Sequence, residues 1–195
     1  GHKNHQEVAG VFGEAPESIQ IVESTEDIPK LQINNPEKLV YLTQTTLSVD
    51  DAQRIIIRLR TRFPQLVGPP KEDICYATQN RQEAVLKLSA DVDVVLVLGS
   101  QNSSNSKRLC ELAQLHGVSA HLVDGVTELQ PDWFDSAEQV LVTAGASAPE
   151  SLVQDCVLWL KERYGASVEE RVIRTESVHF PLPKEMRDWD TAGPK

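Results

Sequence analysis

The sequence has few basic residues and no long apolar run. Nineteen lysines and arginines stand against 29 aspartates and glutamates, which gives a net charge of −10. Because nucleic acids and anionic membranes both bind basic surfaces, this balance argues against either as a partner. No apolar run approaches the roughly 20 residues that a bilayer-spanning helix requires, and no signal peptide is evident. We therefore expect neither nucleic acid nor a membrane as a partner.

Cysteine is also scarce. The chain has three cysteines, Cys75, Cys110 and Cys156, and they lie far apart in the sequence. An odd number at wide spacing is a poor framework for disulfides and favours a reducing, cytoplasmic environment. The first residues, GHKNHQEVAG, carry reactive side chains without an initiator methionine or any lead-in. We expect from this that the sequence is a piece of a longer chain.

The residues that are present predict an α/β fold. A chain of 195 residues with 40% hydrophobic residues can form a buried core. Four apolar runs rich in β-branched residues predict buried parallel strands, at 39–42, 92–98, 118–123 and 139–142. Apolar residues at helical spacing predict helices over 50–63, 78–90, 104–116 and 149–164. The alternation of strand and helix indicates two consecutive small domains with parallel sheets, joined by the glycine- and proline-rich segment 67–71.

Small polar residues follow three of the predicted strands, at 43–46, 99–106 and 143–148, and each group leads into a helix. In parallel α/β sheets ligands bind beyond the carboxyl ends of the strands, where helix N-termini offer unpaired N–H groups to anions. Ordinary helix capping explains any one of these groups, because serine, threonine and asparagine are common N-cap residues. Three groups together favour a shared anionic ligand, best a phosphate or diphosphate. The absence of Walker A and G-x-G-x-x-G motifs disfavours classical nucleotide binding.

The candidates for a reactive role are the three cysteines and the pair His5 and Glu7. Cys75 directly precedes a predicted helix, where its thiolate would be stabilised as a ligand or nucleophile, although a buried structural cysteine is equally compatible. Cys110 and Cys156 lie within helices beside apolar residues, which predicts core positions. His5 and Glu7 are two residues apart, and on an extended strand end they would point to one side. Such a pair suits proton delivery or a metal site, and a solvated loop end is the alternative.

The other titratable segments are predicted to be structural or to lie on the surface. His116, His121 and His179 each stand singly in the sequence. The charged run 184–188 is most simply a solvated face.

Five motifs taken together resemble one enzyme family. In order along the chain they are GHKNHQEV, TQTTLSVDD, DICYATQNRQEAV, GSQNSSNSKRL and TAGASAPESLV. They resemble 4-hydroxy-3-methylbut-2-enyl diphosphate reductase, the LytB-type iron–sulfur enzyme that ends the non-mevalonate isoprenoid pathway. One departure is Gln6, which occupies a position where the family usually has proline. The family has three similar α/β domains around a central [4Fe–4S] cluster, which three cysteines hold with one iron left open.

The resemblance implies a role for each motif. It makes residues 1–71 a second domain that lacks its first part, residues 72–165 a third domain, and residues 166–195 an extension packed on a missing N-terminal domain. It implies that Cys75 is one cluster ligand and that Glu7 supplies or relays protons. Thr45 would bridge Glu7 and the substrate hydroxyl. The substrate diphosphate would be held by His5, Ser103, Ser104, Asn105 and Ser147.

The implied reaction is reductive dehydroxylation of an allylic diphosphate, (E)-4-hydroxy-3-methylbut-2-enyl diphosphate, to isopentenyl and dimethylallyl diphosphate. The electrons would come through the [4Fe–4S] cluster from a donor such as ferredoxin or flavodoxin. The other two cluster cysteines would lie in the missing N-terminal part, since neither Cys110 nor Cys156 matches a ligand position. We therefore expect residues 1–195 alone to hold no cluster and to show no activity.

Two other functions fit the same residues. A non-catalytic α/β module that binds a phosphorylated metabolite would use the polar loops and leave Cys75 structural. A domain similar to phosphosugar isomerases also carries loops rich in serine and threonine, and it would be active without iron.

Overall fold

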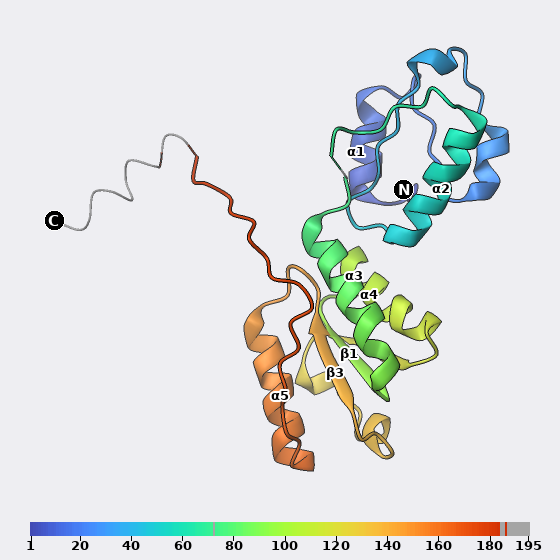
Figure 1. Ribbon diagram of the computed structural model, residues 1–195. Coiled ribbons are helices and arrows are strands. Elements are labelled where there is room, and N and C mark those ends of the chain that lie inside the picture. The colour runs from blue at the N-terminus through green and yellow to red at the C-terminus, as the bar shows by residue number, and fades with distance from the viewer. Residues whose placement is uncertain (72, 184–185, 187–195) are drawn as a thin grey trace.

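A computed structural model describes residues 1–71, 73–183 and 186 of the chain (Figure 1). The chain folds as two parts, residues 1–71 and residues 73–165, followed by an extended tail (Figure 1). Among the described residues no helix is long and apolar enough to cross a bilayer. The domain limits expected from the sequence remain a proposal.

The second part is built on a three-stranded parallel sheet. The central strand β1 (Val94–Leu98) pairs on one side with β2 (Ser119–Val123) and on the other with β3 (Val140–Ala144). All five residues of β1 are buried. Burial of both faces explains why its sequence is continuously apolar rather than alternating. These strands confirm three of the four predicted apolar runs and the α/β fold class.

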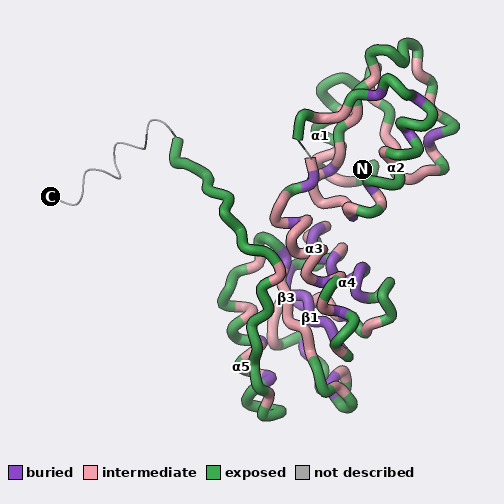
Figure 2. Tube along the Cα trace, in the orientation of Figure 1, coloured by how far each residue is buried: buried purple, intermediate pink, exposed green. Residues whose placement is uncertain are grey.

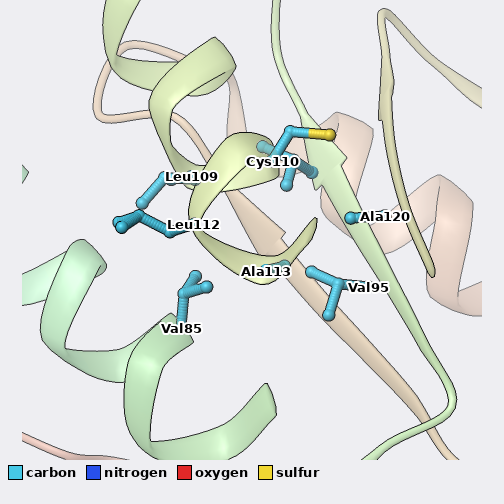
Figure 3. Packing of buried hydrophobic residues seen from close by; sticks show 8 residues of the cluster. Val85, Val95, Leu109, Cys110, Leu112, Ala113 and Ala120 are labelled. Atoms are coloured by element: carbon cyan, nitrogen blue, oxygen red, sulfur yellow. The ribbon is translucent and has the colours of Figure 1, made fainter. Parts of the chain in front are cut away.

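Helices cover both faces of this sheet (Figure 1). One layer consists of α3 (Tyr76–Leu88) and α4 (Ser104–Leu115), and the other consists of α5 (Glu150–Tyr164). Leu109, Leu112 and Ala113 of α4 pack with Val85 of α3 and Val95 of the sheet (Figure 3). The helices agree with the predicted ranges to within two residues at each end.

The two other cysteines are core residues, as predicted. Cys110 of α4 packs in the cluster with Leu109, Leu112 and Val95 (Figure 3), and Cys156 of α5 is fully buried on the other side of the sheet. Burial raises the pKa of the Cys110 thiol, and it raises the pKa of Cys156 to about 11. Burial disfavours the thiolate form of both side chains, as is typical of structural cysteines.

The first part contains α1 (Gln6–Glu14), α2 (Val49–Arg62) and two short 3-10 helices, Thr25–Lys30 and Pro36–Lys38. Its core is formed by Ile28, Leu59, Phe63 and Leu66. Three further 3-10 helices in the second part are Ser89–Asp91, Val126–Glu128 and Pro131–Phe134.

Two predictions for the first part are wrong. The run at 39–42 is not a strand of a sheet, because it makes a single parallel bridge, from Val40 to Val67, with too few ladder hydrogen bonds. The segment around His5 and Glu7 is not an extended strand end. His5 is the N-cap of α1, and Glu7 lies in the first helical turn. An acidic side chain in the first helical turn is favoured by the helix dipole. The two-residue spacing of His5 and Glu7 does not by itself distinguish a helix start from a strand end.

The tail, residues 166–183, runs along α5 and past the start of α3 and is largely exposed (Figures 1 and 2). It touches α3 through Arg174 with Glu83 (2.8 Å) and through Glu176 with Asn80 (3.0 Å). Its packing on another domain remains a prediction. The predicted solvated run 184–188 lies outside the described residues apart from Met186.

The single histidines have the structural or surface positions expected. The ring of His121 stacks on Trp133 with centroids 3.7 Å apart. His116 and His179 are exposed.

Candidate active site

A cavity of about 350 Å³ lies where the loops after β1 and β3 meet the loop before α2. It brings together every candidate site residue from the sequence except Glu7. Its lining consists of His5, Thr45, Thr46, Cys75, Thr78, Asn102, Ser103, Ser104, Asn105, Ala146 and Ser147.

The sheet topology explains why two of these loops converge. The chain leaves β1 for β2 on one side and returns to β3 on the other, so β1 and β3 flank a topological switch point. Ligands in parallel α/β folds bind in the crevice at such a point. The two strand ends are joined by a hydrogen bond in which the N–H of Gly145 donates to the carbonyl of Leu98 (2.8 Å). Arg81 of α3 also donates from Nε to the carbonyl of Ala144 (3.1 Å), which holds the loop that carries Ser147.

Two helices begin at the cavity, and no acidic side chain in their first turns offsets the partial positive charge of their N-termini. Cys75 is the N-cap of α3 and Ser103 is the N-cap of α4. Neither helix has an acidic residue in its first turn, whereas α1, α2 and α5 each have at least one. The partial positive charge of both helix ends is therefore available to an anion in the cavity.

The loop from Ser103 to Asn105 presents hydrogen-bonding groups to the cavity. Ser103 Oγ accepts hydrogen bonds from the N–H of Ser106 (3.2 Å) and from Ser106 Oγ (3.0 Å). Because Oγ is already an acceptor twice, its own hydrogen is free to be donated to a ligand. Ser106 itself is buried, and Ser100 Oγ accepts from the N–H of Asn102, and neither serine lines the cavity.

Asn105 is the most informative side chain in the site. It is only 6% exposed, and neither its Nδ2 nor its Oδ1 has a hydrogen-bond partner among the described residues. Leaving a buried polar group unpaired costs about 1–3 kcal/mol. An amide buried at this cost in a cavity wall is suited to binding a polar ligand rather than to stabilising the fold.

Glu7 lies behind the cavity and reaches it through Thr45. Its carboxylate accepts from the N–H of Thr45 at Oε1 (3.0 Å) and from Thr45 Oγ1 at Oε2 (3.0 Å). His5 Nδ1 lies 4.0 Å from Glu7 Oε2 and is buried without a hydrogen-bond partner among the described residues. Glu7 and Thr45 thus form a hydrogen-bonded link between a carboxylate and the cavity, along which a proton can move, and His5 lies beside it.

Cys75 is the only thiol in the cavity wall as described, and it is free and exposed. Its backbone N–H donates to the carbonyl of Thr45 (3.0 Å), which fixes the start of α3 against the first part. Within the part of the chain that the structure describes, no three histidine, cysteine, aspartate or glutamate side chains gather as a metal site. A single exposed thiol in the cavity wall is suited to be one thiolate ligand of a metal centre.

Four residues of the lining carry no individual prediction from the sequence: Thr46, Thr78, Asn102 and Ala146. Thr78 could have been found, because it follows Cys75 by three residues and therefore lies on the same face of α3. The others lie in loops that the sequence singled out as groups.

Gly145 allows the two strand-end loops to approach each other. A Cβ at this position would lie 2.1 Å from Ser106 Oγ. We expect Gly145→Ala to destabilise the protein by about 2 kcal/mol, as overpacked core substitutions do, in thermal or urea unfolding. Gly10→Ala is the matched control, because nothing lies within 4 Å of its Cβ and an alanine stabilises a helix by about 0.5–1 kcal/mol. Equal stability of the two variants would contradict the close packing described.

Comparison with known proteins assigns the family. The family model described as "LytB protein" matches residues 1–161. The chain belongs to the LytB family. Among curated relatives, a 4-hydroxy-3-methylbut-2-enyl diphosphate reductase of Rhodopirellula baltica is 59% identical over 187 residues, covering 96% of this chain and 59% of the relative. A reductase of the same name from Azoarcus is 52% identical over 188 residues, with 96% and 60% covered.

A solved structure agrees with this assignment to the LytB family. It is described as the E-1-hydroxy-2-methyl-but-2-enyl-4-diphosphate reductase from Plasmodium falciparum, and it is 34% identical with a TM-score of 0.82. The match covers 97% of this chain and 60% of that structure. The chain thus spans about three fifths of the length of the LytB proteins that it matches.

Proposed function

We propose that this chain forms part of an iron–sulfur oxidoreductase, a 4-hydroxy-3-methylbut-2-enyl diphosphate reductase of the non-mevalonate isoprenoid pathway. The observation that carries the proposal is the buried, unpaired amide of Asn105 in a cavity that two unneutralised helix N-termini also face. This arrangement suits a diphosphate, and the relatives are named as enzymes acting on one.

We propose that the diphosphate lies against the N-terminus of α4. Ser103 Oγ donates to one phosphate oxygen, and Asn105 donates from Nδ2 to another. Ser104 and Ser147 line the same wall from the loops after β1 and β3. His5, across the cavity, adds a ring N–H donor. Hydrogen bonds to a charged acceptor are worth about 1.5–3 kcal/mol each, so these donors together can account for tight binding.

Cys75 would hold one iron of a [4Fe–4S] cluster, and two further cysteines from outside this sequence would complete the ligand set. When bound, the cluster supplies the two electrons of the reduction, which a donor such as ferredoxin or flavodoxin delivers in the cytoplasm. The protein contributes position and protons.

The overall change replaces a C–O bond by a C–H bond: the allylic alcohol takes up two electrons and two protons and releases one water. We propose that Thr45 Oγ1 contacts the departing hydroxyl and passes it a proton from Glu7. The geometry supports this order because Glu7 does not line the cavity itself, while Thr45 does.

We also propose that residues 1–71 and 72–165 are the second and third domains of the complete enzyme and that the tail from 166 packs on the first. The exposure of six large apolar side chains after residue 165 supports the proposal that another domain covers this segment. They are Val168, Val172, Val178, Phe180, Leu182 and Met186.

Glu7→Gln in the complete enzyme tests the proton path. The amide has nearly the same size as the carboxyl group but cannot take up and release a proton. We therefore expect the turnover number to fall by about 100-fold or more. The affinity for inorganic pyrophosphate, measured by calorimetry, should stay within about threefold because Glu7 lies behind the cavity. Glu14→Gln, at the exposed end of the same helix, is the control and should behave like the wild type. Unchanged turnover in Glu7→Gln would remove Glu7 from the mechanism.

A further inference from the structure

We infer that Gln82, a buried residue of α3 that does not line the cavity, is a positioning residue that fixes the Thr45–Thr46 wall against the loops of the second part. The inference rests on the proposed function of the cavity and adds a residue to it. Gln82 is 2% exposed and lies one helical turn beyond Thr78, on the helix face that carries Cys75.

Both polar atoms of the Gln82 amide bind the backbone of the first part. Nε2 donates to the carbonyl of Leu47 (2.8 Å), and Oε1 accepts from the N–H of Val49 (3.1 Å). The amide thus satisfies a backbone acceptor and a backbone donor two residues apart, as a neighbouring strand would do. This fixes the distance and register between α3 and the segment that ends at the start of α2.

The bonds of Gln82 complete a regular series. Along residues 43–49 every second residue bonds to the second part: the N–H of Thr43 donates to Asp73 Oδ2 (2.7 Å), and the carbonyl of Thr45 accepts from the N–H of Cys75 (3.0 Å). Leu47 and Val49 follow with Gln82. Thr45 and Thr46 lie in the middle of this series, and both line the cavity.

An ion pair on the outer side of the same junction supports the arrangement. Arg108 Nη2 of α4 lies 2.6 Å from Asp51 Oδ2 in the first turn of α2. Burial opposes ionisation of Asp51, but the guanidinium groups of Arg54 and Arg108 outweigh it and hold the pKa of this carboxyl below its usual value. This ion pair joins the two parts in addition to the hydrogen bonds made by Thr43, Thr45 and Gln82.

Loss of a positioning residue should lower substrate affinity, whereas loss of a merely structural residue should lower overall stability. Without the two hydrogen bonds of Gln82 the segment that carries Thr45 and Thr46 keeps its contacts with Cys75 and Glu7 but loses those at Leu47 and Val49, so the width of the cavity between this wall and the diphosphate loops is less firmly fixed. The N-cap position of Cys75 is unaffected. Substrate affinity should therefore suffer more than cluster assembly or overall stability.

The test uses Gln82→Met in the complete enzyme with Gln53→Met, an exposed glutamine of α2, as the matched control. We expect the dissociation constant for inorganic pyrophosphate and the KM for substrate to rise about tenfold in Gln82→Met, the loss of one to two hydrogen bonds. The iron content and cluster absorbance should be unchanged. Wild-type affinity in Gln82→Met overturns the inference. Failure of the wild-type enzyme to bind pyrophosphate overturns the proposed function itself, and this inference with it.

Gln82→Glu keeps the inference testable if the methionine variant does not fold. A protonated glutamic acid reproduces both hydrogen bonds, with its O–H donating to Leu47, whereas the carboxylate repels that carbonyl. Because burial raises the pKa of a carboxyl, the variant should bind pyrophosphate nearly as well as the wild type at about pH 6 and progressively worse towards about pH 8.5. The readout is the ratio of variant to wild-type affinity, with Gln53→Glu as the control. A ratio that does not change with pH contradicts the positioning role.

Discussion

Replacing Asn105 by leucine is expected to abolish tight diphosphate binding while leaving the ligand-free protein at least as stable as the wild type. The leucine fills a similar volume and removes a buried amide that has no hydrogen-bond partner among the described residues. We expect the free energy of unfolding to rise by up to about 1 kcal/mol and the affinity for inorganic pyrophosphate to fall by about 10- to 100-fold. Thermal unfolding with and without pyrophosphate measures both quantities on the complete enzyme.

The opposite signs of these two effects separate a ligand-binding residue from a structural one. Adding Ser103→Ala should lower the affinity further and leave the cluster spectrum intact, since Ser103 and Cys75 belong to different helices. Asn34→Leu, an exposed asparagine of the first part, is the control for the change of side chain. Loss of stability in Asn105→Leu, or loss of the cluster in the double variant, would show that the loop is structural.

Cys75→Ser is expected to abolish cluster assembly in the complete enzyme. Cys75 is the free, exposed cysteine of the chain and lines the cavity, whereas the other two cysteines are buried. A serine hydroxyl is a poor replacement for a thiolate on iron, so iron content and cluster absorbance should fall to background and turnover should disappear.

The control for this variant is Cys110→Ala. Cys110 lies in the core with its pKa raised by burial, so its loss should cost about 1 kcal/mol of stability and leave the cluster in place. Pyrophosphate should still bind to Cys75→Ser, because the diphosphate loops do not depend on the thiol. Full iron content in Cys75→Ser would contradict the assignment of this residue.

The second part of the fold is well predicted from the sequence because its signals are local. A short, continuously apolar run rich in β-branched residues, such as Val94–Leu98, is typical of a strand that is buried on both faces. Gly117 and Gly165 lie at helix ends with positive φ angles of 81° and 67°. The first part is less predictable. The run at 39–42 has strand composition but only one bridge, and whether a strand forms depends on a neighbour that local sequence does not reveal.

The loops that form the site could be predicted from the sequence, but most of the side-chain contacts within and behind it could not. Small polar residues after successive strands meet at one edge of a parallel sheet, which is why Ser103, Asn105 and Ser147 could be placed in one cavity. The role of Gln82 could not be seen, because a polar residue inside a helix pattern gives no sign of what it faces. Likewise the path from Glu7 through Thr45 joins residues 38 apart in sequence, and only the fold brings them together.

The proposed reaction is tested most directly by product analysis with the complete enzyme, a chemical reductant and (E)-4-hydroxy-3-methylbut-2-enyl diphosphate. We expect isopentenyl and dimethylallyl diphosphate as products, with a KM that rises in Asn105→Leu and no turnover in Cys75→Ser. A protein that binds pyrophosphate in this cavity, yet assembles no cluster and forms neither product, would contradict the proposed reaction and would instead be a module that binds a phosphorylated metabolite.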